Sequence, residues 1–273
     1  MTSPPDPRSV WIRQMAAVPV LAALVDAVGP RRLLPVKGIV TARTLYRDPA
    51  ERALSDIDVR VSDVATLHEV IAFAEAKCHV VKHYLPAYRT AVLEMHGIDV
   101  DVECTVGAPG LCALSVATML GRATVGTELF GFPCAIPELH DHALFLAVNL
   151  FKDKITLAHP WQVEDVIRIA AVPAFDPARF VALAGEARSL AIACVVAEWL
   201  APRSAGWRAV REEMGPRPPR RGYVRLLRWL FAHAPESTAT RVLARLASDD
   251  RAMRLEAFTA AARYLRESNT ALR

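Results

Sequence analysis

The chain has 273 residues, of which 53% are hydrophobic and 23% charged. This composition excludes a disordered protein and allows one large or two modest folded domains. Its five cysteines form no C-x-x-C pair, so we expect reduced core thiols in a cytoplasmic protein and no zinc site. The first ten residues do not have the pattern of a signal peptide, and the apolar stretch 15–28 is too short to span a membrane. We therefore expect no association with a membrane.

The first predicted elements are a helix over 10–28, a strand over 33–36 and a short helix over 39–46. Lys37 and Gly38 lie between the strand and the short helix. A strand, a glycine turn and a helix start direct backbone N–H groups and the positive end of a helix dipole toward an anion. Lys37 would add a positive charge, so this turn is a candidate phosphate site.

The segment 55–61 alternates with the period of a strand, which places Asp56, Asp58 and Arg60 on one face and its apolar residues on the other. Carboxylates two residues apart on a strand lie roughly 6–7 Å apart along it and repel each other. A divalent cation would remove that repulsion, and Mg²⁺ prefers oxygen ligands. Such a pair is more often a solvated strand face. The adjacent phosphate turn favours a metal site here.

A helix from residue 64 precedes three further predicted strands, at 78–84, 89–95 and 98–106. The last of these carries Asp99, Asp101 and Glu103 on one face. Because neighbouring strands lie about 4.8 Å apart, one of these carboxylates can join Asp56 and Asp58 at a shared cation. An acidic exposed edge strand is the alternative.

Several of these residues together resemble the signature of a bacterial family of largely uncharacterised nucleotidyltransferases. This family belongs to the superfamily of DNA polymerase β and kanamycin nucleotidyltransferase. The residues are Lys37-Gly38, Leu45-Tyr46, Pro49, Arg52 and Asp56-Ile57-Asp58. The resemblance covers roughly Val20 to Ala170. It implies metal-dependent transfer of a nucleoside monophosphate from a nucleoside triphosphate, with ATP expected first, to a hydroxyl acceptor.

The resemblance also implies roles for the carboxylates. Asp56 and Asp58 would bind metal, and Asp101 would be the third ligand or the base, with Asp99 as a second candidate. The ions would be two Mg²⁺, or Mn²⁺ in their place, roughly 3.5–4 Å apart and in line with the attacking and leaving oxygens.

Nucleotide contacts are expected from the turn and from two other basic residues. Lys37 and Gly38 would hold phosphate, and Arg52 would contact the nucleotide or pair with one of the aspartates. Lys152 ends a predicted helix and is a further candidate for the triphosphate, although the helix dipole alone accounts for a lysine there.

Two positions depart from the pattern of the family. Ile39 follows Gly38 where the superfamily usually has Ser or Gly, and Glu103 replaces a histidine. They motivate an alternative hypothesis: a catalytically degenerate member of the same fold that binds a nucleotide or a protein partner. The retained carboxylates favour catalysis.

The rest of the chain is predicted to be mostly helical. Residues 121–136 form a hairpin, and helices follow over 139–152, 160–170, 176–199, 223–234 and 239–266. The spacing of His140 and His142 on a helix argues against a shared metal, so both are expected at the surface. We therefore predict an α/β (α+β) catalytic domain with a mixed five-stranded sheet over 1–135. An all-helical domain follows over 136–273, with a Pro/Arg-rich linker near 215–222.

The charge is uneven along the chain. From Arg203 to Arg273 there are 15 Arg, no Lys and 7 Asp+Glu, which gives +8 and leaves −4 for the residues before it. Arginine-rich helix surfaces explain this region without a function, and we favour that explanation because no recognised nucleic-acid motif accompanies the charge. An RNA surface is the alternative. A small molecule, a protein side chain and an RNA 3′ end therefore all stay open as the acceptor.

Overall fold

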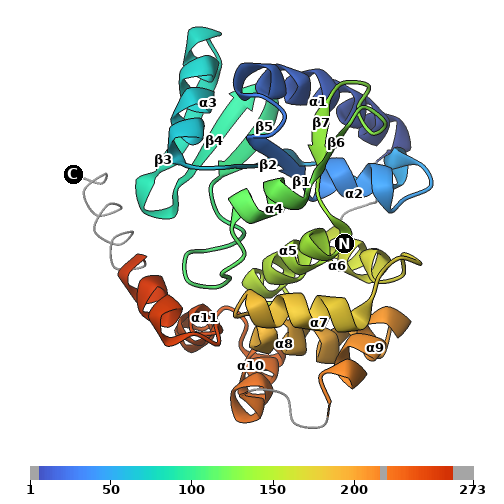
Figure 1. Ribbon diagram of the computed structural model, residues 1–273, viewed down its shortest axis with the longest axis vertical. Helices are drawn as coiled ribbons and strands as arrows, with labels where there is room; N and C mark the ends of the chain where they lie inside the picture. Colours follow the sequence, from blue (N-terminus) through green and yellow to red (C-terminus); the bar gives the residue numbers. More distant parts are fainter. Residues whose placement is uncertain (1–5, 216–219, 261–273) are drawn as a thin grey trace. The chain divides into compact units, whose positions relative to one another are not determined.

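The computed structural model describes residues 6–215 and 220–260. Contacts between residues divide the chain into two compact units (Figure 1). The first comprises Met1–Thr105 and Val116–Glu138, and the second comprises Val106–Ser115 and Leu139–Arg273. The expected division into 1–135 and 136–273 differs from these units mainly in residues 106–115, which group with the second unit.

A mixed five-stranded sheet forms the centre of the first unit, as the sequence predicts. Its strands, in spatial order, are β1 (Leu33–Val36), β2 (Asp56–Val61), β5 (Ile98–Glu103), β4 (Thr90–Met95) and β3 (Val80–Leu85). The central pair, β2 and β5, runs parallel, and the other neighbours run antiparallel. A separate hairpin of β6 (Thr124–Gly126) and β7 (Cys134–Ile136) confirms the hairpin expected over 121–136.

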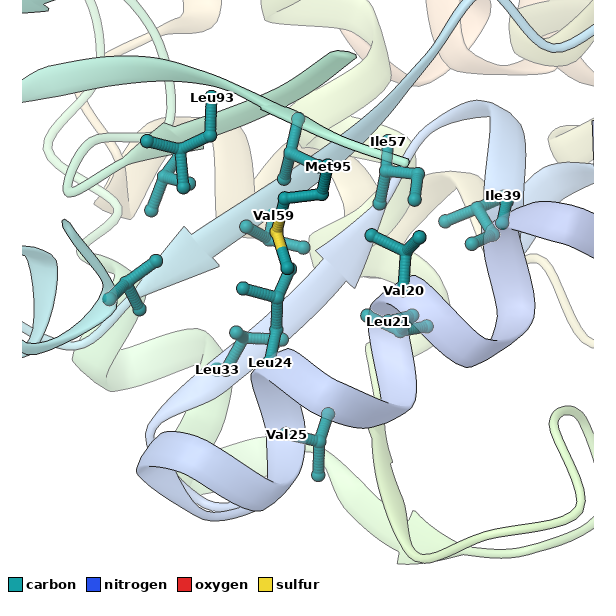
Figure 2. Packing of buried hydrophobic residues seen from close by; sticks show 14 of the residues in the cluster. Val20, Leu21, Leu24, Val25, Leu33, Ile39, Ile57, Val59, Leu93 and Met95 are labelled. Atoms are coloured by element: carbon teal, nitrogen blue, oxygen red, sulfur yellow. The ribbon is translucent and has the colours of Figure 1, made fainter. Parts of the chain in front are cut away.

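Helices α1 (Pro7–Val28) and α3 (Val64–Ala76) bury one face of this sheet. Figure 2 shows Leu21 and Leu24 of α1 packed with Val59 of β2 and Met95 of β4. Because side chains alternate along each strand, the acidic residues of β2 and β5 lie on the opposite face. The apolar core thus determines which face of the sheet is polar.

The apolar character of α1 follows from this packing. By length and composition alone, Arg8–Val28 is long and apolar enough to cross a membrane, a test that the core helix of a soluble protein also passes. Ala17, Leu21 and Leu24 have no exposed surface and belong to the core of the first unit. Packing on the sheet therefore accounts for the apolar side chains of this helix.

Two short helices complete the part of the first unit that the structure describes. The loop after β1 leads into α2 (Gly38–Thr44), and α4 (Val116–Arg122) contacts β1 and β2. Single turns of 3-10 helix, η1 (Pro49–Glu51) and η2 (Pro86–Tyr88), precede Arg52 and β4.

The described part of the second unit is helical, as expected. Its helices are α5 (Leu139–Lys152), α6 (Pro160–Ile169), α7 (Pro177–Glu186), α8 (Leu190–Leu200), α9 (Ala205–Glu213), α10 (Arg221–His233), α11 (Thr238–Arg245) and a last segment over 251–260. The Pro/Arg-rich linker expected near 215–222 follows α9, but α10 already begins at Arg221, so the last two residues of that range are helical. Residues 216–219 lie outside the described part of the chain.

Three expectations for this region are wrong. His140 and His142 are buried, because α5 is surrounded by packing from His140 to Phe151. The single helix over 176–199 is two helices, since the backbone turns at Arg188, where φ is +54°. The hydroxyl of Ser189 donates to the carbonyl of Ala187 at 2.9 Å at the same place.

The helix expected over 239–266 is also interrupted. It ends at Arg245 and resumes at Arg251, where the Asp250 carboxylate accepts hydrogen bonds from the backbone N–H groups of Ala252 and Met253. Residues 261–266 lie outside the described residues.

Candidate active site

Three carboxylates converge on the polar face of the first unit's sheet. The parallel register of β2 and β5 places Asp58 beside Asp101 and Asp56 beside Asp99. One carboxylate oxygen from each of Asp56, Asp58 and Asp101 lies within 4.8 Å of the others. Asp58 is buried, and the other two are half-buried. The structure therefore brings Asp101 of β5 to the Asp56–Asp58 pair of β2, which is the arrangement that the sequence predicts for a shared cation.

Asp99 lies outside this acidic cluster. Its carboxylate pairs with Lys82 Nζ at 2.6 Å, and the same ammonium contacts Glu94 at 2.6 Å. The side chain of Asp99 is 44% exposed. Of the two candidates for the third carboxylate, the geometry therefore favours Asp101, whose role as ligand or base stays a prediction.

The carboxylates of the acidic cluster repel one another, and this repulsion changes their pKa values. Burial, and after it the charges of Asp58 and Asp56, raise the pKa of Asp101 to about 6. Burial and the charge of Asp58 also raise the pKa of Asp56, although Ser55 donates to its carboxylate at 2.5 Å. Asp56 and Asp101 are therefore harder to ionise than in water, a condition that a bound divalent cation relieves.

Lys37 partly compensates this negative charge. Its backbone has φ of +51° at the turn from β1 into α2, and its Nζ lies 2.5 Å from Asp58 Oδ1. Burial alone would lower the pKa of Lys37, but the charge of Asp58, the hydrogen bond to it and the charge of Glu103 together raise this pKa. One ammonium does not balance three ionised carboxylates, so the cluster keeps an excess of negative charge.

Gly38 allows a guanidinium to lie against the start of α2. A Cβ at this position would come within 3.1 Å of Arg52 Nη1 and 3.0 Å of Leu54 Cδ1, closer than side chains normally pack. Arg52 is largely buried, and its charge acts to lower the pKa of Asp56. The turn therefore places two cationic side chains, Lys37 and Arg52, next to the acidic cluster.

The two departures from the family pattern have structural explanations. Ile39 has no exposed surface and packs in the core of the first unit, so no side chain from that position is available to a phosphate. Glu103 lies beside Arg60 in the β2–β5 register, and its carboxylate is 3.4 Å from Arg60 Nη2. Arg60 is fully buried, so the residue that replaces the histidine balances a buried charge.

The sequence reasoning did not find this Arg60–Glu103 pair. The signal was present in the parallel strings Asp-Ile-Asp-Val-Arg and Asp-Val-Asp-Val-Glu, which match at every apolar position and have opposite charges at the last.

Lys152 belongs to the second unit, in the last turn of α5. That position complements the helix dipole, and a role for Lys152 at the triphosphate stays a prediction.

The mixed sheet, its acidic cluster and the adjoining strand–glycine–helix turn are features of a nucleotidyltransferase. A protein family described as uncharacterised nucleotidyltransferases matches residues 15–201, more than half of the chain, and the chain belongs to this family. No curated protein and no solved structure matches the chain.

Proposed function

We propose that this protein transfers a nucleoside monophosphate from a nucleoside triphosphate to a hydroxyl acceptor, with divalent metal ions. The proposal rests on the carboxylate oxygens of Asp56, Asp58 and Asp101, which lie within 4.8 Å of one another on the polar face of the sheet. Membership of the family supports a nucleoside triphosphate as the donor. The dependence on metal, the preference for ATP and the acceptor are parts of the proposal.

The donor set fits Mg²⁺, with Mn²⁺ as a substitute. All three side chains offer hard oxygen ligands, and the excess of negative charge over Lys37 favours a divalent ion. When bound, such ions neutralise charge on the triphosphate and lower the pKa of the acceptor hydroxyl.

The side chains of the cluster would divide the work between them. Asp56 and Asp58 hold the metal, and Asp101 is the third ligand or accepts the proton of the acceptor hydroxyl. A carboxylate whose pKa is raised to about 6 is a better general base near neutral pH than an ordinary aspartate.

The cationic side chains would serve the nucleotide. Lys37 would leave Asp58 and contact the triphosphate, and Arg52 with the Gly38 backbone would hold a second phosphate. Lys152 is a further candidate for this role.

The acceptor is open among a small molecule, a protein side chain and an RNA 3′ end. Part of the arginine-rich region that motivates an RNA partner lies outside the described residues. We propose a cytoplasmic location, where nucleoside triphosphates are available.

The test is a labelled-nucleotide assay with matched aspartate variants. Purified protein is incubated with each of the four labelled nucleoside triphosphates, with and without Mg²⁺ or Mn²⁺. Asp58→Asn and Asp101→Asn are compared with Asp99→Asn, which removes the same charge from β5 outside the cluster. Mn²⁺ affinity is measured in parallel by electron paramagnetic resonance.

We expect Mn²⁺ binding and nucleotide-dependent labelling to fall sharply in the two cluster variants and to persist in Asp99→Asn. Equal Mn²⁺ affinity in all four proteins would refute the metal site. Metal and nucleotide binding without transfer to any acceptor tested would instead favour the degenerate member of the fold.

A further inference from the structure

The second unit contains a cavity that has no part in the proposed transfer. Its volume is about 470 Å³, which lies within the range of small-molecule sites in proteins. It is lined by residues of α8, α9 and α10 and by Met214 and Gly215, which follow α9, all within the second unit.

Arginines dominate the lining of this cavity. Arg221, Arg225 and Arg228 follow one another at the spacing of one face of α10, and Arg211 comes from the last turn of α9. The adjoining face of α10 packs inward through Val224, Leu227 and Phe231. The guanidinium groups therefore lie beside the core packing, where residues of the neighbouring helices line the same cavity.

The internal carboxylates do not balance these charges. Glu198 of α8 pairs with Arg228, and Glu212 of α9 also lines the cavity. Arg211, Arg221 and Arg225 form no ion pair with any other residue that the structure describes. Four cations against two carboxylates leave the lining at +2, so like charges face one another across the cavity.

Solvated surface arginines are the alternative explanation. Arg211, Arg221 and Arg225 are exposed, as Trp229 and Leu226 are, so exposure alone does not separate the two explanations. The binding site is favoured by the charge of the lining, because three of its arginines have no ion pair among the described residues. In addition, the Nε of Arg228 is buried there without a hydrogen-bond partner.

We propose that this cavity binds a phosphorylated small molecule that carries free hydroxyl groups. Guanidinium groups pair bidentately with phosphate oxygens, and several of them match a ligand of at least two negative charges. Glu212 would repel a bare anion but can accept hydrogen bonds from hydroxyl groups on the organic part of the ligand. A partly open cavity of about 470 Å³ suits a small molecule, whereas a nucleic acid needs contacts along many phosphates.

The experiment measures binding to the full-length protein without divalent metal. Isothermal titration calorimetry is run with ribose 5-phosphate, pyrophosphate and inorganic phosphate as probes. The double variant Arg221→Gln/Arg225→Gln is compared with Arg208→Gln/Arg241→Gln, which removes the same charge from exposed positions of α9 and α11 outside the cavity. Circular dichroism checks that each variant is folded. Lys37→Met serves as a control for binding at the candidate active site.

We expect saturable binding of ribose 5-phosphate that is weakened at least about tenfold by the cavity variant, because charged hydrogen bonds are lost. The other double variant and Lys37→Met should change it less than about twofold. Three results would overturn the proposal: no saturable binding of any probe at millimolar concentration, equal loss in both double variants, or loss in Lys37→Met. Salt-sensitive RNA binding that both double variants weaken equally, without binding of the small probes, would make this region a nucleic-acid surface instead.

Discussion

Replacement of Lys37 by Met should strengthen the binding of free metal and weaken the binding of nucleotide. In the structure the Lys37 ammonium lies 2.5 Å from Asp58 Oδ1, where a metal ligand is needed. A cation at the acidic cluster and this ammonium would therefore compete for the same carboxylate. For the nucleotide the effect of Lys37 has the opposite sign, because the ammonium would attract the phosphates and favour nucleotide binding.

The magnitude follows from Coulomb's law. Two unit charges about 4 Å apart interact by about 1 kcal/mol in water and about 4 kcal/mol at the effective dielectric near a protein surface. A divalent ion doubles the repulsion, so even the value for water gives about 2 kcal/mol, or roughly 30-fold in affinity. The lysine can avoid this repulsion only by giving up its ion pair with Asp58, which also costs free energy.

The assay is a titration with Mn²⁺ at pH 8, where the neighbouring carboxylates are ionised, followed by a second titration in the presence of ATP. Lys82→Met is the matched control, because Lys82 pairs with Asp99 and Glu94 outside the cluster. We expect tighter Mn²⁺ binding by Lys37→Met, weaker ATP binding, and neither effect in Lys82→Met. Weaker or unchanged Mn²⁺ binding by Lys37→Met would refute the competition between the lysine and the metal.

Three further predictions concern the turn, a helix cap and a buried histidine. Gly38→Ala should raise the KM for the nucleotide without changing Mn²⁺ affinity, since its Cβ would come within 3.1 Å of Arg52 Nη1 and displace that guanidinium; an unchanged KM would show that Arg52 is not used. Asp63→Ala should lower the free energy of unfolding in urea by about 1 kcal/mol, because the carboxylate accepts from the backbone N–H of Thr66 at 2.8 Å; no loss would show that the cap is dispensable. Burial lowers the pKa of His142 from 6.5 to about 4. The unfolded chain therefore binds the extra proton between these values, and stability should fall by about 3 kcal/mol as the pH falls through this window. In His142→Leu the stability profile should be flatter there, and an unaltered slope would contradict the assignment.

The period-two alternation of two strands was sufficient to predict the core face and the acidic face of the sheet. Apolar residues at every second position leave only one way to bury them, so Asp56 and Asp58 necessarily share a face with Asp101 once their strands are neighbours. The alternation alone could not predict whether Asp99 or Asp101 joins the pair, because both lie on the same face of β5. The choice depends on Lys82, which reaches Asp99 from the other edge of the sheet, and on the parallel register of β2 and β5.

Local patterns were less informative about the helices. Gly185 alone is a weak signal for the break at Arg188, where hydrogen bonds of Ser189 replace those of a continuous helix. His142 was expected at the surface because its spacing from His140 argued against a shared metal, whereas packing buries α5 from His140 to Phe151. Both errors come from tertiary contacts that override local preference.

The Arg60–Glu103 pair explains which residue stands at the position where the family pattern has a histidine. The carboxylate of Glu103 lies 3.4 Å from Nη2 of Arg60, which is fully buried on the adjoining strand. This pair is two residues beyond Asp58 and Asp101 along the same two strands. A buried arginine is costly without a carboxylate beside it, so Glu103 contributes to the stability of the strand pair that holds the cluster. The residue at the histidine position therefore supports β2 and β5, and one carboxylate oxygen from each of Asp56, Asp58 and Asp101 lies within 4.8 Å of the others beside it.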